Sequence, residues 1–353
     1  MEKEFIYTEN SYFGASNSYS GFISYFDRIF KRDEFLRVFI IKGGPGTGKS
    51  SFMKKVLSEF YGKLNTEAIY CSSDPSSLDG IILSNENGKI AFIDGTAPHA
   101  EETAYPGAKD EIIDLGQCWD RAWLSGSYDK IKALSKEKKE AYNTAYSYLK
   151  IAGHCHEIIE KMTVKVYKRN ESRQKAMSFA EQISTKRDGK KDVRLISAFC
   201  KSGKYSLKTL EKKGVVRYSI EGEGLTTYLF LEDIICALDF IGANYRRYPS
   251  PFSEKLTEAV YLSDEDILIS QSEIGEVIDC GEFLSEGQSV LSEQAKTTEI
   301  IRNDALREAQ RWLGIASDFH FRLEEIYSPS MDFNKCDVIF SEKLALCKNL
   351  LGL

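Results

Sequence analysis

The stretch that decides the fold is Lys42-Gly43-Gly44-Pro45-Gly46-Thr47-Gly48-Lys49-Ser50-Ser51. The residues before it, 35–41, form a short apolar run rich in β-branched and aromatic side chains, which predicts a buried parallel strand. The residues after it, 52–60, predict an amphipathic helix whose apolar face carries Phe52, Val56, Leu57 and Phe60. Strand, glycine loop and helix thus follow in the order that the G-x-x-x-x-G-K-[ST] pattern of a phosphate-binding loop, or P-loop, requires.

Each residue type in this loop has a chemical role. The glycines remove Cβ atoms, so that the backbone can curl and direct its N–H groups at phosphate oxygens. The helix N-terminus adds partial positive charge. We expect Lys49 to neutralise the β- and γ-phosphates and the Ser50 hydroxyl to ligate Mg²⁺. The expected ligands are a nucleoside triphosphate, taken to be ATP, and Mg²⁺, and the expected binding residues are Gly43, Gly44, Pro45, Gly46, Thr47, Gly48, Lys49, Ser50 and Ser51.

A second chemical signal follows in residues 89–94, where four apolar residues end in Asp94, as in a Walker B strand. One further strand, 67–71, is predicted between the two motifs. An aspartate at the carboxyl end of a strand beside the P-loop strand is expected to hold Mg²⁺, directly or through a water. We therefore expect Asp94 to be the second metal-ligating residue and, with Lys49, part of the catalytic set.

The next residue, Gly95, stands where many ATP hydrolases have a glutamate as general base. Asp74, Asp79 and His99 are the nearby polar candidates for that role. Asp74 follows the second predicted strand, where small-molecule kinases often have the carboxylate that contacts the acceptor, and His99 is placed to sense the γ-phosphate. For each of them, a turn or loop residue without catalytic function is the alternative.

The second half of the chain repeats the first. Residues 111–119, EIIDLGQCW, recur as 276–284, EVIDCGEFL, an offset of 276 − 111 = 165. Further matches keep an offset of 164 and pair Ala141, Ala145, Leu149, Ile151, Ala152, His156 and Glu160 with Ala305, Ala309, Leu313, Ile315, Ala316, His320 and Glu324. Matches held in one register over this distance predict a tandem duplication.

The second copy lacks the phosphate-binding residues. The predicted strand 215–220 leads into residues 221–228, EGEGLTTY, in which Thr227 stands at the expected lysine position. The Walker B counterpart, residues 266–270, is followed by Gln271 where Asp94 would align. Two glutamates would face the phosphates and repel them. The second half is therefore predicted to be a pseudo-ATPase domain.

The connection between the halves is basic. Residues 161–194 contain 11 Lys and Arg against 4 Asp and Glu, a local charge of 11 − 4 = +7 in a chain whose net charge is −6. A solvated helix end with a linker is one interpretation. In the other, Arg169, Arg173, Arg187 or Arg194 reaches phosphate as an arginine finger or binds a phosphate-bearing or protein partner. Upstream, residues 128–162 predict one long helix or a helical hairpin.

Taken together, the chain resembles a family of bacterial P-loop ATPases of the AAA type, found mainly in Firmicutes, that are built from two tandem NTPase-like halves. The resemblance covers nearly the full length and rests on residues 42–50, KGGPGTGKS, residues 71–80, CSSDPSSLDG, and residues 91–99, AFIDGTAPH. It implies ATP binding and an α/β core, and it gives no substrate. This chain departs from the family in its second half, which there keeps a P-loop.

Composition narrows the class of protein further. The charge of −6 gives no general attraction to nucleic acid, and no apolar run is long enough for a membrane span. The first residues lack the pattern of a secretory signal. Eight scattered cysteines without a C-x-x-C pair predict reduced thiols in a cytoplasmic protein, and the adjacent His154, Cys155 and His156 are interpreted as structural rather than metal-binding.

The sequence thus predicts an α/β P-loop NTPase with doubly wound, mostly parallel sheets, tandemly duplicated, with a helical extension on each copy. We expect an active domain over 1–184, a linker over 185–192 and a degenerate domain over 193–353. The predicted function is a slow ATPase or ATP-driven switch with one nucleotide site. The alternatives are a small-molecule or nucleotide kinase with Asp74 as base, a non-catalytic nucleotide-gated binding module and, as the weakest, contact of the basic connector with nucleic acid.

Overall fold

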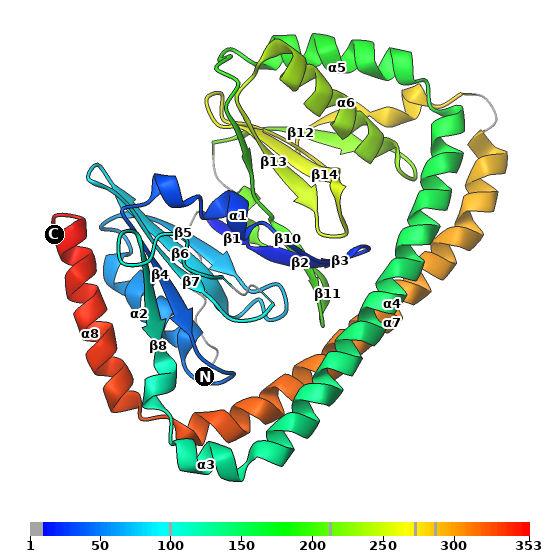
Figure 1. The fold of residues 1–353 in the computed structure, drawn as a ribbon. Helices are drawn as coiled ribbons and strands as arrows, with labels where there is room; N and C mark the ends of the chain where they lie inside the picture. The colour runs from blue at the N-terminus through cyan, green and yellow to red at the C-terminus, as the bar shows by residue number, and fades with distance from the viewer. Residues whose placement is uncertain (1–9, 99–100, 212–213, 272–273, 286–287) are drawn as a thin grey trace.

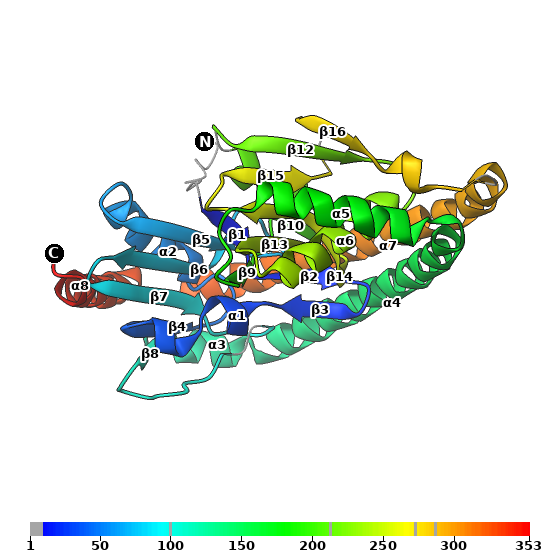
Figure 2. The same ribbon diagram turned by 90° about the horizontal axis from the view of Figure 1, so that it is seen from above.

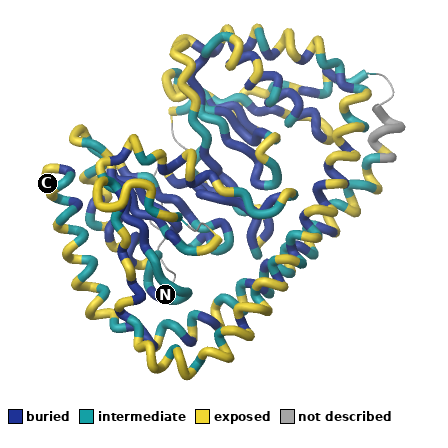
Figure 3. Tube along the Cα trace, viewed as in Figure 1, coloured by how far each residue is buried: buried dark blue, intermediate teal, exposed yellow. Residues whose placement is uncertain are grey.

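The structure is a computed structural model that describes residues 10–98, 101–211, 214–271, 274–285 and 288–353. Figure 1 shows two α/β lobes, each built on a six-stranded sheet, on one side of a pair of long helices. The buried residues gather in the sheets and the helices that cover them, whereas the long helices have many exposed positions (Figure 3). Both sheets are mixed, so the fold is α/β with parallel and antiparallel neighbours.

The sheet of the first lobe contains the predicted P-loop strand near one edge. Its order is β1 (Ser11–Phe13), β5 (Asn65–Tyr70), β6 (Leu78–Asn85), β7 (Gly88–Asp94), β4 (Arg37–Lys42) and β8 (Asp110–Asp114). The predicted strands at 35–41, 67–71 and 89–94 are confirmed as β4, β5 and β7. The predicted helix at 52–60 is confirmed within α2 (Lys49–Phe60), which buries all four expected side chains.

The sheet of the second lobe has the same order and the same directions. Its strands are β9 (Lys191–Val193), β13 (Tyr245–Ser250), β14 (Ser253–Leu262), β15 (Ile267–Ser270), β12 (Val216–Glu221) and β16 (Glu276–Asp279). In each sheet the third strand, β6 or β14, is antiparallel to both of its neighbours, and the other neighbouring pairs are parallel.

The third strand is where the sequence prediction was incomplete. Two strands, β5 and β6, lie between the P-loop and Asp94 instead of the single expected one. β6 joins β7 through a tight turn at 86–87, which forces the two strands to be antiparallel neighbours. Within the described chain, α2 is the only α-helix between β4 and β8. A fully doubly wound sheet, with a helix in every crossover, is therefore not formed.

The repeated sequence block forms the same local structure in both lobes. β8 and β16 each end in an aspartate, Asp114 or Asp279, that starts a short 3₁₀ helix, η2 (Leu115–Cys118) or η4 (Cys280–Phe283). The carboxylate of Asp114 accepts a hydrogen bond from the Gly116 amide at 2.8 Å, and that of Asp279 accepts one from the Gly281 amide at 2.7 Å. Both are capping interactions of the kind expected for aspartate.

Two long helices join the lobes. α4 (Tyr128–Val166) starts at the first lobe, and α7 (Gln288–Tyr327) starts at the second and returns to the first (Figure 1). With 39 residues, α4 is about 58 Å long, which confirms a continuous helix over the predicted 128–162. Alanines and leucines of both helices, including Ala145, Ala309 and Leu313, are buried together along the seam.

The helices that follow the long pair are exchanged between the lobes. α5 (Arg169–Ile183) lies along α6 (Thr226–Ile241) of the second lobe and shares its apolar core (Figure 2). α8 (Phe333–Leu350) packs on the first lobe, where the Phe340 ring lies 5.4 Å from that of Phe52 and Lys343 pairs with Glu111 at 2.6 Å. Packing therefore does not follow the expected division at 184 and 193, and β9 begins inside the expected linker.

Two hairpins complete the contact between the lobes. The first is β2 (Ala15–Ser18) with β3 (Gly21–Ser24), and the second is β10 (Ser197–Cys200) with β11 (Gly203–Ser206). The Asn17 side-chain amide donates to the Phe199 carbonyl at 2.7 Å, and the Phe199 amide donates to the Ser16 hydroxyl at 3.2 Å. The hairpins thus bind each other by reciprocal polar contacts in buried surroundings.

The seam predicts a clear effect of overpacking. Ala145 is fully buried against α7, so Ala145→Leu adds volume where the helices are closest and should lower the free energy of unfolding by about 1–3 kcal/mol. Asn143→Leu, at an exposed position of the same helix, is the matched control. Thermal unfolding of the three proteins measures the difference, and equal melting temperatures for the two variants would contradict the packing.

Candidate functional site

The loop between β4 and α2 has the backbone that its glycines permit. Gly46 and Gly48 have φ of +66° and +85°, which side-chain-bearing residues seldom adopt, and Gly48 is the N-cap of α2. A Cβ on Gly43 would lie 2.6 Å from the Thr47 hydroxyl oxygen. That hydroxyl donates to the Gly44 carbonyl at 2.8 Å and closes the loop. The residues therefore form a compact cradle at the start of a helix.

Lys49, the first residue of α2, folds back across this cradle. Its ammonium donates to the carbonyl of Gly44 at 2.8 Å and to that of Gly43 at 3.3 Å. The same group lies 3.7 Å from a carboxylate oxygen of Asp94, and both side chains are nearly buried, with 12% and 14% exposed. The structure thus brings together the two residues that the sequence singled out from motifs 45 residues apart.

Asp94 reaches this position because β7 lies next to β4, in parallel, with Asp94 opposite Ile41. Its other carboxylate oxygen accepts hydrogen bonds from the amide and hydroxyl of Thr96 at 2.9 and 2.6 Å. Burial raises the pKa of Asp94, nearby Asp79 raises it further, and Lys49 opposes both. The Ser50 hydroxyl accepts from the Leu78 amide at 2.9 Å. The site therefore concentrates buried negative charge beside the cradle.

Asp74 is held in a local turn. One carboxylate oxygen accepts from the amide and hydroxyl of Ser76 at 3.2 and 2.8 Å, and the other accepts from the Ser77 hydroxyl at 2.7 Å. Burial raises the pKa of Asp74, but these hydrogen bonds outweigh it and leave the pKa lowered. This is the geometry of a turn-forming aspartate and a poor one for a general base. His99 lies outside the described residues.

The open face of the cradle is covered by the C-terminal part of the chain. A Cβ on Gly44 would lie 3.0 Å from the ring of Tyr327, and one on Gly46 would lie 3.1 Å from the backbone and Cβ of Glu324. Both covering residues belong to α7. In the sequence, Glu324 is recognised only as the repeat of Glu160 and has no predicted role. Its contact with Gly46 joins residues far apart in the chain, and such a contact leaves no local sequence pattern.

A lysine of α4 approaches the same place. The Lys138 ammonium lies 3.5 Å from Nδ1 of His320, and Nε2 of His320 lies 3.5 Å from a carboxylate oxygen of Glu324. Burial lowers the pKa of Lys138, and the nearby charge of Lys49 lowers it further, while Glu324 opposes both. Both long helices therefore bring charged side chains to the P-loop, and no motif of the sequence points to Lys138.

The corresponding loop of the second lobe has the same closure without the charged residues. The Thr226 hydroxyl donates to the Glu223 carbonyl at 2.8 Å, as Thr47 does to Gly44, and a Cβ on Gly222 would lie 2.5 Å from that hydroxyl. Counting on from this contact places Tyr228 at the position of Lys49. The sequence alignment, which had Thr227 there, was wrong by one residue.

The arginines of the basic stretch are used within the second lobe and at its border. Arg169 and Arg173 lie 2.8 and 3.5 Å from a carboxylate oxygen of the buried Asp233 on α6. Arg194 pairs with Asp192 at 2.6 Å and with Glu67 at 3.5 Å, and Arg187 is exposed. Arg169, Arg173 and Arg194 therefore pair with carboxylates here, and contact of one of the four arginines with a phosphate stays a prediction.

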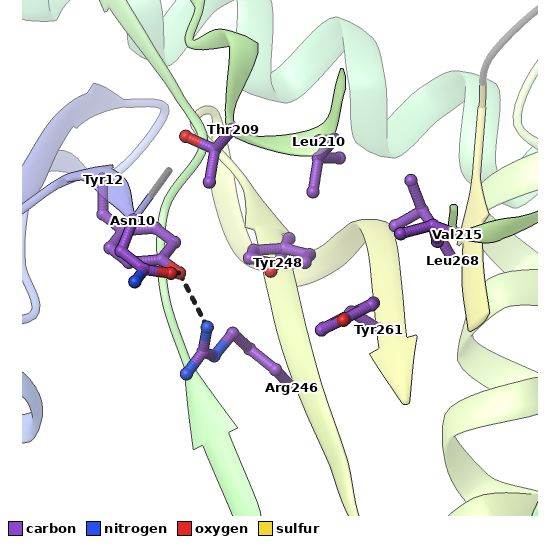
Figure 4. A pocket seen from close by; sticks show the side chains of 9 residues that line it. All are labelled: Asn10, Tyr12, Thr209, Leu210, Val215, Arg246, Tyr248, Tyr261 and Leu268. Atoms are coloured by element: carbon purple, nitrogen blue, oxygen red, sulfur yellow. Dashed lines mark hydrogen bonds between the residues drawn. The ribbon is translucent and has the colours of Figure 1, made fainter. Parts of the chain in front are cut away.

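One cavity, of about 40 Å³, lies between the lobes and away from the P-loop (Figure 4). Its lining includes Tyr12, Tyr248 and Tyr261, and Arg246 donates to the Tyr12 hydroxyl at 2.7 Å. A space of this size holds about one or two waters. The residues that line this cavity are part of the contact between the lobes.

The cysteines, two of the histidines and the character of the helices complete the description of the candidate residues. All eight cysteines are free thiols. His154 is exposed and His156 is buried, and within the described ranges no cluster of three or more potential ligands is arranged to hold a metal ion. None of the helices in the described parts of the chain has the length and apolar character needed to cross a membrane.

The chain was compared with models of protein families, with curated proteins and with solved structures, and none of them matches it.

The contact between the P-loop and α7 predicts an unequal effect of two alanine substitutions. Gly46 and Gly189 have nearly the same φ, +66° and +69°, so an alanine at either position costs about 1–2 kcal/mol of backbone strain. Only at Gly46 does the new Cβ also meet Glu324, whereas nothing lies within 4 Å at Gly189. Gly46→Ala should therefore lower the melting temperature more than Gly189→Ala, and an equal loss would contradict the contact.

Proposed function

We propose that the first lobe binds a nucleoside triphosphate, ATP, with Mg²⁺, and that the protein is a slow ATPase or an ATP-driven switch. The observation that carries the proposal is the meeting of Lys49, the first residue of α2, with Asp94, at the end of the strand that lies in parallel beside β4. The glycine loop lies between β4 and α2. Groups of this kind in this order supply the cation for the phosphates and the carboxylate for the metal in P-loop proteins.

The donor set fits Mg²⁺, which prefers oxygen ligands and keeps several waters. The Ser50 hydroxyl and the Asp94 carboxylate would hold it. Burial and nearby Asp79 both disfavour the charged form of Asp94, so a cation at this place would relieve the repulsion. When bound, Mg²⁺ would neutralise negative charge on the phosphates.

Slow turnover is favoured over fast hydrolysis by what surrounds the site. Gly95 follows Asp94 and offers no carboxylate to activate a water. Asp74 has both carboxylate oxygens engaged and a lowered pKa, so it is a poor base for hydrolysis and equally for the alternative reaction of a small-molecule kinase. A binding module without turnover stays the second candidate, favoured by the helix that covers the loop.

We further propose that the two lobes arose by tandem duplication and that the second is a degenerate copy, as in the bacterial tandem ATPases that the sequence resembles. Three features support this. The sheets have the same order and directions, the repeated block forms the same capped turn, and both loops are closed by a threonine hydroxyl. The second loop has Tyr228 in place of Lys49, so only the first lobe would bind nucleotide.

Lys49→Ala is the direct test of the nucleotide site. It removes the cation expected on the β- and γ-phosphates, so Mg·ATP binding in titration calorimetry should fall below detection. Lys63→Ala removes an exposed lysine near the end of the same helix and should bind like the parent. Equal affinity of Lys49→Ala and the parent would refute the proposal.

Asp94→Asn tests the metal site separately. It keeps the size of the side chain and removes the charge, so ATP affinity measured with Mg²⁺ should fall about tenfold or more, while affinity measured in excess chelator should change little. Phosphate release without any acceptor, measured on the parent, then separates an ATPase from a module that only binds. A loss that is the same with and without Mg²⁺ would contradict a metal-ligating role for Asp94.

A further inference from the structure

The long helices place one acidic and one basic side chain at the P-loop, and neither is explained by the motifs of the first lobe. Glu324 lies near the C-terminal end of α7, which packs beside the lobe that contains β4 and α2 (Figure 1). Lys138 lies in the first part of α4. The two residues are more than 180 positions apart and are linked through His320.

Glu324 lies against a glycine of the loop that a phosphate would approach. A Cβ on Gly46 would lie 3.1 Å from the backbone and Cβ of Glu324. A hydrogen bond from His320 lowers the pKa of Glu324, whereas burial raises it. The charge of His320 and the Gly46 amide lower this pKa further. Glu324 is therefore a carboxylate at neutral pH. A carboxylate at this place has the charge and the acceptor oxygens of a phosphate.

Lys138 is poised on the other side of the same cluster. Its ammonium is 3.5 Å from His320, which in turn is 3.5 Å from Glu324. It is also near enough to Lys49 for the two charges to disfavour each other. Two lysines, Lys49 across the cradle and Lys138 linked to Glu324 through His320, form a site for an anion with more charge than one carboxylate.

We propose that Lys138 is a phosphate-binding residue of the same nucleotide site and that Glu324 covers Gly46 of the glycine loop until a triphosphate displaces it. The inference rests on the proposed function and names how that site is regulated. Glu324 and a phosphate cannot both lie against Gly46, because both are anions and Glu324 already fills the space there. Displacement frees Lys138 and His320 from Glu324, and Lys138 then pairs with the terminal phosphate.

The second lobe provides matched controls. At the offset of 164, Arg302 corresponds to Lys138, His156 to His320 and Glu160 to Glu324. His156 lies 6.4 Å, between ring centroids, from Tyr228, the residue that replaces Lys49, and Arg302 is near both of them. Because this copy lacks the lysine and the Walker B aspartate, substitutions there should leave nucleotide binding unchanged.

The experiment measures the dissociation constants of Mg·ATP and Mg·ADP for the parent chain and five variants. Glu324→Gln removes the competing charge and should tighten ATP binding about tenfold. Lys138→Met should weaken ATP about tenfold and ADP much less, since it contacts the terminal phosphate. Arg302→Met and Glu160→Gln should match the parent. Lys138→Arg should restore the preference for ATP, and melting temperatures identify any variant that fails to fold.

The outcomes separate the two claims. If the parent does not bind Mg·ATP at all, or binds it independently of Lys49, the proposed function fails and this inference with it. If the parent binds ATP through Lys49 but Glu324→Gln does not bind it more tightly, Glu324 does not compete with phosphate. If Lys138→Met weakens ATP and ADP equally, or neither, Lys138 does not contact the terminal phosphate. Either of the last two results overturns the inference and leaves the proposed function standing.

Discussion

The packing of α4 against α7 is the contact on which the rest of the structure depends. Buried alanines on both helices, Ala145 and Ala309 among them, let the two backbones come close over a long distance. Each helix leaves one lobe and delivers its following helix to the other, α5 to α6 and α8 to α2. The lobes therefore cannot separate without breaking the apolar core that each exchanged helix completes.

The same seam decides what surrounds the P-loop. Because α7 returns to the first lobe, its last turns cover the glycine cradle with Glu324 and Tyr327. Because α4 starts there, Lys138 reaches the same cluster through His320. Both long helices run between the two lobes (Figure 1).

The two lobes have the same loop closure but different side chains around it. The turn that closes each loop uses a backbone carbonyl and a threonine hydroxyl, and it therefore does not depend on the lysine that only the first loop has. There the basic connector serves a structural purpose, because Arg169 and Arg173 offset the buried charge of Asp233. The two loops therefore share their backbone turn and differ in the charged side chains around it.

The sequence by itself determined the local strands and helices of the first lobe and predicted that Lys49 and Asp94 would lie together. Strand β4, the glycine loop and α2 followed from apolar periodicity and from glycines, and the pairing of Asp94 with Lys49 followed from motif order. These depend on neighbours close in sequence or on one strand adjacency. The sequence repeat also showed which residues of the two halves correspond, such as Glu160 and Glu324.

Only the tertiary structure decided how those parts meet. The exchange of α5 and α8, the cover of the P-loop by Glu324 and Tyr327 and the approach of Lys138 through His320 all join residues far apart in the chain. The antiparallel strand β6 is different, because a tight turn at 86–87 joins it to β7. Periodicity tells which face of a helix is apolar but not which lobe that face will cover, since both lobes offer similar apolar surfaces. A turn residue was one of the two interpretations of Asp74, and its hydrogen bonds to Ser76 and Ser77 favour that one.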